Sequence, residues 1–90
     1  MEKRGKLEII RDIFKIIQEN HNSIKPTPLL RKSNLSSQRF YEYLNKLLEK
    51  GFVKEIRDKK EKKYIILTDK GLRYLERYKN IISFIEEFEL

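Results

Sequence analysis

The segment GFVKEIRDKKEKKYIILTDKG, residues 51–71, constrains the fold of this chain more than any other part of the sequence. Two β-prone runs, 52–57 and 63–67, are separated by five residues that are all charged, 58–62. Runs rich in Val, Ile, Phe and Tyr on either side of a short polar segment are typical of an antiparallel β-hairpin. The tip contains no glycine, so the sequence predicts a longer, mobile loop instead of a tight two-residue turn.

A broad apolar stripe predicts a helix over about residues 5–20. Its members recur at spacings of three and four residues, and they are Leu7, Ile10, Phe14 and Ile17, widened by Ile9, Ile13 and Ile16. Such a broad stripe indicates a helix at the centre of the fold. Ile24 and Lys25 are expected to be extended, because the residue before Pro26 is steered away from the helical conformation. This short extended segment could pair with the hairpin.

Two short helices are expected between this segment and the hairpin. The first covers about residues 28–33, with Thr27 as its cap and Asn34 closing it in a left-handed conformation. The second runs from about residue 36 to residue 50 and is stopped by Gly51. At 100° per residue its apolar side chains share one face, which predicts the core residues Phe40, Tyr43, Leu44, Leu47 and Leu48.

The opposite face of this third helix is polar. It carries Gln38, Tyr41, Glu42 and Asn45, flanked by Arg39 and Lys46. Amide and guanidinium groups can form paired hydrogen bonds with base edges in the major groove of DNA, so this face is a candidate for base reading. An ordinary solvent-exposed face is the simpler interpretation of the helix taken alone, and the helical pattern does not separate the two.

Basic residues outnumber acidic residues by 21 to 14, which gives a net charge of +7. The excess is uneven, because residues 81–90 hold three acidic residues and no basic one, whereas residues 1–80 carry a net +10. A basic body favours a polyanionic partner. The alternative is the generally charged surface of a small, thermophile-like protein.

The hairpin tip concentrates this basic charge. Five basic side chains crowd around it: Arg57, Lys59, Lys60, Lys62 and Lys63. Lysines at an exposed strand edge also discourage aggregation, which is the structural explanation for them. Their density is greater than edge protection needs, so the tip is a candidate for contact with phosphates.

A last helix is expected from Thr68 or Asp69, either of which can cap it. An apolar seam runs along it at spacings of 4, 3, 4 and 3 residues, formed by Tyr74, Tyr78, Ile81, Ile85 and Phe88. A second stripe contains Leu72, Leu75 and Ile82. Such an alternation is typical of a coiled-coil seam, and a small core would leave its second half exposed. The pattern favours a homodimer through this helix, and the alternative is that the helix folds back onto the first one.

Several kinds of chemistry lack support in the sequence. There are no cysteines, and the single histidine, His21, has no neighbouring metal ligand. Three glycines are too few for a phosphate-binding loop, and Ser36 and Ser37 have no accompanying base. No apolar run reaches the length of a membrane span, and the N-terminus does not resemble a signal peptide. We therefore expect a soluble intracellular protein that is not an enzyme, with no metal, cofactor or small-molecule ligand.

The stretch NLSSQRFYEYLNKLLEKGFVKE, followed by YIILTDKGLRYLERY, resembles a family of small archaeal winged-helix DNA-binding proteins. In this family a recognition helix ends in Leu-Glu-Lys-Gly, and a hairpin leads into Leu-Thr-x-x-Gly. Some members are nucleoid or chromatin proteins that dimerise through a C-terminal antiparallel coiled coil, and others are transcriptional regulators. The resemblance extends over nearly the whole chain.

The resemblance implies an α+β fold, a winged helix-turn-helix with a three-helix core and a β-hairpin wing over residues 1–68, and a dimerisation helix over residues 69–90. It implies that double-stranded DNA is bound by Ser37, Gln38, Arg39, Tyr41, Asn45, Lys46, Lys59, Lys60 and Lys62, to which the charge pattern adds Arg57. The dimer interface would contain Tyr74, Tyr78, Ile81, Ile85 and Phe88, with Ile82 from the second stripe. A homodimer in the cytoplasm, on the nucleoid, is the expected state. The alternative is a winged-helix protein-interaction module that does not bind DNA.

Overall fold

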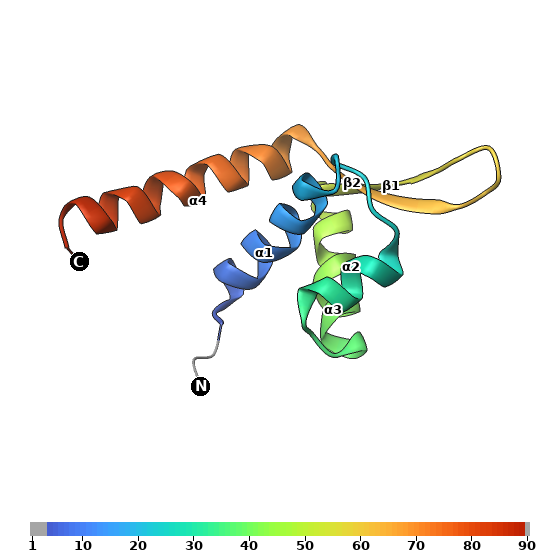
Figure 1. Cartoon of the computed structure of the whole chain (residues 1–90), viewed down its shortest axis with the longest axis horizontal. Helices are drawn as coiled ribbons and strands as arrows, with labels where there is room; N and C mark the ends of the chain where they lie inside the picture. Colours follow the sequence, from blue (N-terminus) through green and yellow to red (C-terminus); the bar gives the residue numbers. More distant parts are fainter. Residues whose placement is uncertain (1–3, 90) are drawn as a thin grey trace.

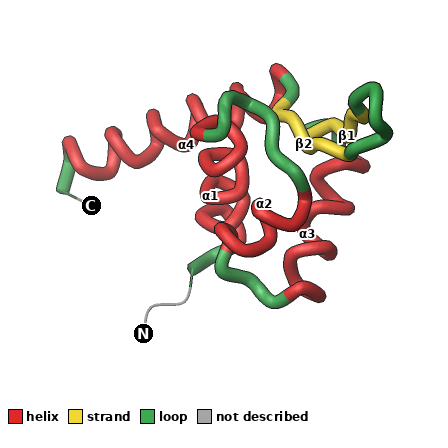
Figure 2. Tube along the Cα trace, turned by 45° about the vertical axis from the view of Figure 1, so that its right-hand side comes forward, coloured by secondary structure: helices red, strands yellow, loops and turns green. Residues whose placement is uncertain are grey.

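The structure is a computed structural model that describes residues 4–89, and it contains a helical body with a hairpin and a long helix extending from it (Figure 1). The elements follow in the order α1 (Lys6–Glu19), α2 (Pro26–Ser33), α3 (Ser37–Glu49), β1 (Val53–Arg57), β2 (Lys63–Leu67) and α4 (Asp69–Glu87). Helices α1, α2 and α3 surround one core, the hairpin leaves it on one side and α4 on the other (Figures 1 and 2). The predicted α+β winged-helix arrangement is confirmed.

Helix α1 supplies the largest share of the core, as its broad apolar stripe predicts. Its buried residues are Ile9, Ile10, Ile13, Phe14 and Ile17. The prediction was wrong for Leu7, which is 59% exposed. Leu7 lies in the first turn of α1, and the buried part of the helix begins only at Ile9, so helical spacing alone overestimated the length of the packed face.

The segment before α2 pairs with the hairpin, as expected. The backbone N–H of Ile24 donates to the carbonyl of Ile65 over 3.1 Å, and the N–H of Ile65 donates to the carbonyl of Ile24 over 2.7 Å. Strands β1 and β2 are antiparallel, with Val53 opposite Leu67 and Arg57 opposite Lys63. The alternation of the strands buries Val53, Ile65 and Leu67 at the base, and the outer part of the hairpin projects into solvent.

Helix α2 begins earlier than predicted. Its N-cap is Lys25, with extended backbone and no side-chain hydrogen bond, and Pro26 occupies the first helical position. Thr27 is therefore inside the helix and does not cap it. Proline suits the first position because it has no N–H to satisfy there and its φ is already helical. The predicted left-handed end at Asn34 is confirmed, with φ of 61°.

Helix α3 has the predicted bounds and core face. Ser36 caps it by accepting a hydrogen bond from the N–H of Arg39. Phe40, Leu44 and Leu47 are buried, whereas Tyr43 and Leu48 pack against the core at its edge. The chain leaves the helix through Gly51, whose φ of +78° favours glycine.

The first half of α4 packs against the body, and the second half extends away from it (Figure 1). The Tyr74 ring meets Phe14 edge-on at 5.2 Å between centroids, and its hydroxyl donates to the carbonyl of Leu7 over 2.9 Å. From Lys79 to Glu89 every residue is exposed. The alternative of a fold-back onto α1 therefore holds for the start of the helix, and the expected exposure holds for its end.

The division of the chain into a winged-helix domain, residues 1–68, and a dimerisation helix, residues 69–90, stays a prediction. Tyr74 and Leu75 of the second segment pack against the core that the first segment forms. Residues 1–3 and 90 of these two segments lie outside the described residues. Within residues 4–89, no helix has the length and apolarity that crossing a membrane requires.

Candidate nucleic-acid interface

Helix α3 presents a continuous exposed polar face to solvent. Each of its six predicted DNA-contact residues is exposed, and they are Ser37, Gln38, Arg39, Tyr41, Asn45 and Lys46. The Tyr41 ring lies edge-on to the buried Phe40 ring, with 5.1 Å between the centroids. The core thereby supports one aromatic side chain on this polar face. All six side chains are accessible to a ligand, and contact with DNA itself stays a prediction.

The charges on this face of α3 are balanced. Arg39 and Lys46 are matched in number by Glu42 and Glu49, and all four side chains are exposed. A balanced face gives little general attraction for phosphates. If α3 meets DNA, its contribution must come from specific hydrogen bonds, and the attraction must come from neighbouring elements.

The loop of the hairpin is organised by Asp58. Its carboxylate oxygen Oδ1 accepts hydrogen bonds from the backbone N–H groups of Lys60, over 2.8 Å, and Lys62, over 2.9 Å. The backbone N–H of Asp58 also donates to the carbonyl of Lys62. The loop is therefore longer than a two-residue turn, as predicted, and an Asx-type turn shapes it. Its mobility stays a prediction.

The cations around the tip of the hairpin, over residues 57–63, fall into two groups. Arg57 lies 3.9 Å from Glu55 and 3.7 Å from Glu61, and Lys63 lies 3.7 Å from Glu55. Within residues 4–89, three further lysines form no ion pair with a carboxylate, and they are Lys59, Lys60 and Lys62. These three lysines, which we call the wing lysines, are the cations of the tip most available to phosphates.

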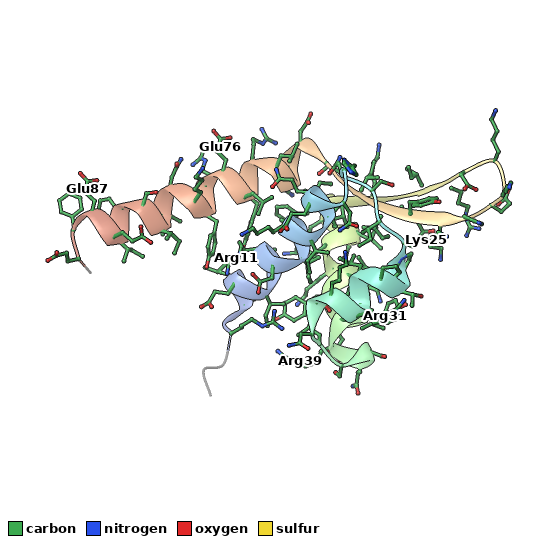
Figure 3. All side chains as sticks on the ribbon, in the orientation of Figure 1. Arg11, Lys25, Arg31, Arg39, Glu76 and Glu87 are labelled. Atoms are coloured by element: carbon green, nitrogen blue, oxygen red, sulfur yellow. The ribbon has the colours of Figure 1, made fainter. Side chains whose placement is uncertain are left out.

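Sequence reasoning missed two basic residues beside the hairpin, Lys25 and Arg31. Both project from the side of the domain on which the hairpin extends, whereas Arg39 lies at the far end of α3 from the hairpin tip (Figure 3). The Lys25 ammonium group lies 6.0 Å from the centre of the Tyr64 ring on β2. Residues 25–33 and 53–67 together hold nine basic and three acidic residues. A count of charge around the second helix could have found this signal.

The exposed end of α4 forms a second feature, an apolar strip. Its members are Ile81, Ile82, Phe84, Ile85 and Phe88, which are 37–59% exposed. Phe84 was not predicted, although it stands one helical turn before Phe88 and their rings are 5.0 Å apart. Of the predicted interface, Tyr74 and Tyr78 already pack within the chain, where their rings stack at 6.4 Å and the Arg11 guanidinium lies 5.1 Å from the Tyr78 ring.

A hollow of about 800 Å³ lies beside this strip, between α1 and α4. Apolar side chains of α4 line it, among them Leu75 and Ile82, together with Arg11 and Lys15 of α1. Metal-binding side chains do not gather here or elsewhere in residues 4–89, where no cluster of three His, Asp or Glu residues could hold an ion. The two surfaces to explain are therefore the α3–hairpin region and the end of α4.

Comparison with known proteins identifies a matching family and similar solved structures. A family model described as winged helix-turn-helix matches residues 3–86. Among curated proteins, no sequence matches the chain. The crystal structure of Sso10a-2, a DNA-binding protein from Sulfolobus solfataricus, superposes with a TM-score of 0.73 at 20% sequence identity, covering 96% of this chain and 86% of that one. F93 from STIV, a winged-helix DNA-binding protein, superposes with a TM-score of 0.72 at 16% identity, covering 89% and 91%.

Proposed function

We propose that this chain, which belongs to the winged helix-turn-helix family, binds double-stranded DNA as a homodimer. The observation that carries the proposal is the pairing of two surfaces. A polar, exposed face of α3 stands beside α2 and a hairpin whose segments hold nine basic and three acidic residues. In the helix-turn-helix arrangement the second helix lies in the major groove and the first crosses the phosphate backbone. The balanced face of α3 then meets bases, and the basic surface meets phosphates.

The roles of the side chains follow from their chemistry. Gln38, Asn45 and Arg39 can form paired hydrogen bonds with base edges, which gives sequence information. The wing lysines are flexible point charges that hold phosphates without reading sequence. Arg57 shares its charge with two carboxylates at long distance and is exposed, so phosphates can compete for it. Both structural neighbours are described as DNA-binding proteins, which supports this assignment.

Dimerisation is proposed from the end of α4. A strip of five large apolar side chains without cover in the single chain indicates a partner surface. The charge of α4 is polarised, because residues 69–80 hold four basic and two acidic residues, whereas residues 81–90 hold three acidic residues and no basic one. Two copies of α4 in antiparallel orientation bring the acidic half of each against the basic half of the other. This complementarity favours an antiparallel homodimer.

The proposal includes two biological roles, a transcriptional regulator and a nucleoid-associated protein. They differ in sequence preference, because a regulator must distinguish its site from random DNA and an architectural protein need not. Either role would locate the protein on the nucleoid. The competing function is a protein-interaction module, which the exposed strip on α4 favours if the chain has no affinity for DNA.

The decisive measurement is the affinity for a random duplex as a function of salt concentration, by fluorescence anisotropy. Each phosphate neutralised contributes about −0.9 to the slope of log affinity against log salt. The homodimer carries six wing lysines, three from each protomer, which together predict a slope of about −5. Absence of binding at low salt would reject DNA binding and leave the protein-interaction module.

A further inference from the structure

Glu42 occupies the middle of the exposed face of α3. At 100° per residue, Gln38, Asn45, Lys46 and Glu49 all lie within about 60° of it around the helix axis. All of these side chains are exposed. If this face of α3 meets the bases, it must therefore bring the Glu42 carboxylate toward the DNA together with the amides of Gln38 and Asn45.

The Glu42 carboxylate is not neutralised by the protein. Within residues 4–89 it takes part in no ion pair, although Lys46 stands one helical turn away on the same face. A free carboxylate facing DNA is repelled by every phosphate, whatever the sequence. Its presence at the centre of a DNA-facing surface lowers the affinity for random DNA unless a base provides compensation.

Only two groups in the major groove can compensate a carboxylate, because it is a pure hydrogen-bond acceptor. These donors are the N4 amino group of cytosine and the N6 amino group of adenine. Adenine also presents the N7 acceptor beside its amino group, which repels a carboxylate and suits an amide. Cytosine N4 is therefore the better partner for Glu42, and the neighbouring Gln38 and Asn45 are better matched to adenine.

We propose that Glu42 is a specificity-determining residue that selects cytosine at one position of each DNA half-site and weakens binding to all other sequences. This inference rests on the proposed DNA binding. The two kinds of residue then have separate roles. The wing lysines attract any duplex, whereas Glu42 lowers the affinity for every duplex that has no amino group facing its carboxylate. The chain then has the means to distinguish a site, which a purely architectural protein does not need.

Glu49 provides a matched control. It has the same side chain and lies on the same face, but it is the last residue of α3, seven residues or about 10.5 Å along the helix from Glu42. In helix-turn-helix proteins the N-terminal residues of the recognition helix contact the bases. Glu42 lies in the N-terminal half of α3, and Glu49 does not.

The test is selection from a randomised duplex library with the full chain, using wild type, Glu42→Gln and Glu49→Gln. Wild type is expected to enrich cytosine at one position of each half-site. In Glu42→Gln the preference for cytosine is expected to fall by about fivefold or more, which corresponds to the loss of one base contact. The selected base should shift toward adenine. The variant should also bind random duplex at least as tightly as wild type. Glu49→Gln should keep the cytosine.

Two results would overturn the inference. If wild type binds duplex DNA and Glu42→Gln selects the same bases with the same strength, Glu42 does not determine specificity. The same conclusion follows if both variants change the preference equally. If wild type retains no duplex at low salt, the proposed function itself fails, and the selection separates that outcome from the first two. Circular dichroism of each variant confirms that an exposed substitution leaves the fold intact.

Discussion

Gly71 in the first turn of α4 lies directly against the backbone carbonyl of Phe52. A methyl group at position 71 would stand 2.5 Å from that oxygen and 2.8 Å from a methyl group of Leu67. The Thr68 hydroxyl adds to the same junction, since it lies 2.7 Å from the carbonyl oxygen of Gly51 and 3.0 Å from that of Phe52. The Leu-Thr-x-x-Gly motif thus joins α4 to the end of α3 and the start of β1.

Gly71→Ala is expected to destabilise the fold, by about 1–3 kcal/mol for an overpacked site. For a domain of this size, each kcal/mol lowers Tm by about 4–8 °C. The sign is diagnostic, because Gly→Ala inside an unhindered helix would stabilise it by about 0.5–1 kcal/mol. Ser83→Ala, at an exposed position of the same helix, is the control and should change stability by less than about 0.5 kcal/mol. Thermal melts that show Gly71→Ala as stable as wild type would contradict the close contact.

Much of the fold was predictable because its signals are local. The period of the apolar residues predicts α1 and α3, two β-prone runs on either side of a charged tip predict the hairpin, and the Ser36 and Thr68 caps predict two helix starts. Each of these depends on residues close together in the sequence. The errors were also local in origin, since at the start of α2 the first-position preference of Pro26 prevailed over capping by Thr27.

The rest depends on packing between distant segments, which a single sequence does not reveal. The position of Lys25 beside Tyr64 follows from the bridge between Ile24 and Ile65. The exposed face of α3 could be predicted by counting residues around the helix. Which of its side chains contact DNA could not, and those contacts stay predictions. Likewise, the apolar seam of α4 predicted an exposed second half, but it gave no sign that Tyr74 and Tyr78 would pack within the chain and not in a dimer interface.

Tyr74 gives a prediction for the pH dependence of stability. Burial raises the pKa of Tyr74 above its ordinary value of 10.0, Tyr78 raises it further, and Arg11 acts in the opposite direction. The unfolded chain therefore loses this proton first as pH rises. The resulting contribution to stability is complete below about pH 10 and is lost as pH rises through the folded pKa.

Tyr74→Phe isolates this contribution. The variant loses the hydrogen bond to the Leu7 carbonyl, which should cost about 0.5–1.5 kcal/mol at neutral pH. Above about pH 10, wild type should lose stability faster than the variant, so the difference between them should shrink. Urea denaturation from about pH 8 to 11 measures it. A difference that stays constant over this range would show that the pKa of Tyr74 is the same in both states.

The wing lysines are expected to determine the salt dependence of DNA binding. Replacing Lys59, Lys60 and Lys62 by alanine removes up to three phosphate contacts per protomer, or six per dimer, and should make the slope of log affinity against log salt shallower by up to about 5. The fold should be unaffected, because all three side chains are exposed and the backbone of the loop is held by Asp58. Anisotropy titrations at several salt concentrations measure the slope.

A matched control removes three basic residues from elsewhere. Lys6 and Lys15 on α1 and Arg73 on α4 are exposed, and none of them belongs to α2, α3 or the hairpin. Their triple alanine variant lowers the net charge equally and should leave the slope close to that of wild type. Equal slopes for the two triple variants would mean that net charge alone, and not the wing, governs binding.

The end of α4 is expected to hold two copies together. Ile81→Glu combined with Ile85→Glu puts two carboxylates into the apolar strip, where pairing would bury them without partners, so the variant should be a monomer. Asn80→Glu with Ser83→Glu adds the same charge more than about 100° around the helix from the strip's centre and should remain a dimer. Multi-angle light scattering gives the mass of each. The monomer should keep its melting temperature if Tyr74 and the core complete the fold within one chain. It should bind DNA more weakly than the dimer, because the two linked modules of a dimer gain avidity. A double variant that stays dimeric would place the interface outside the strip.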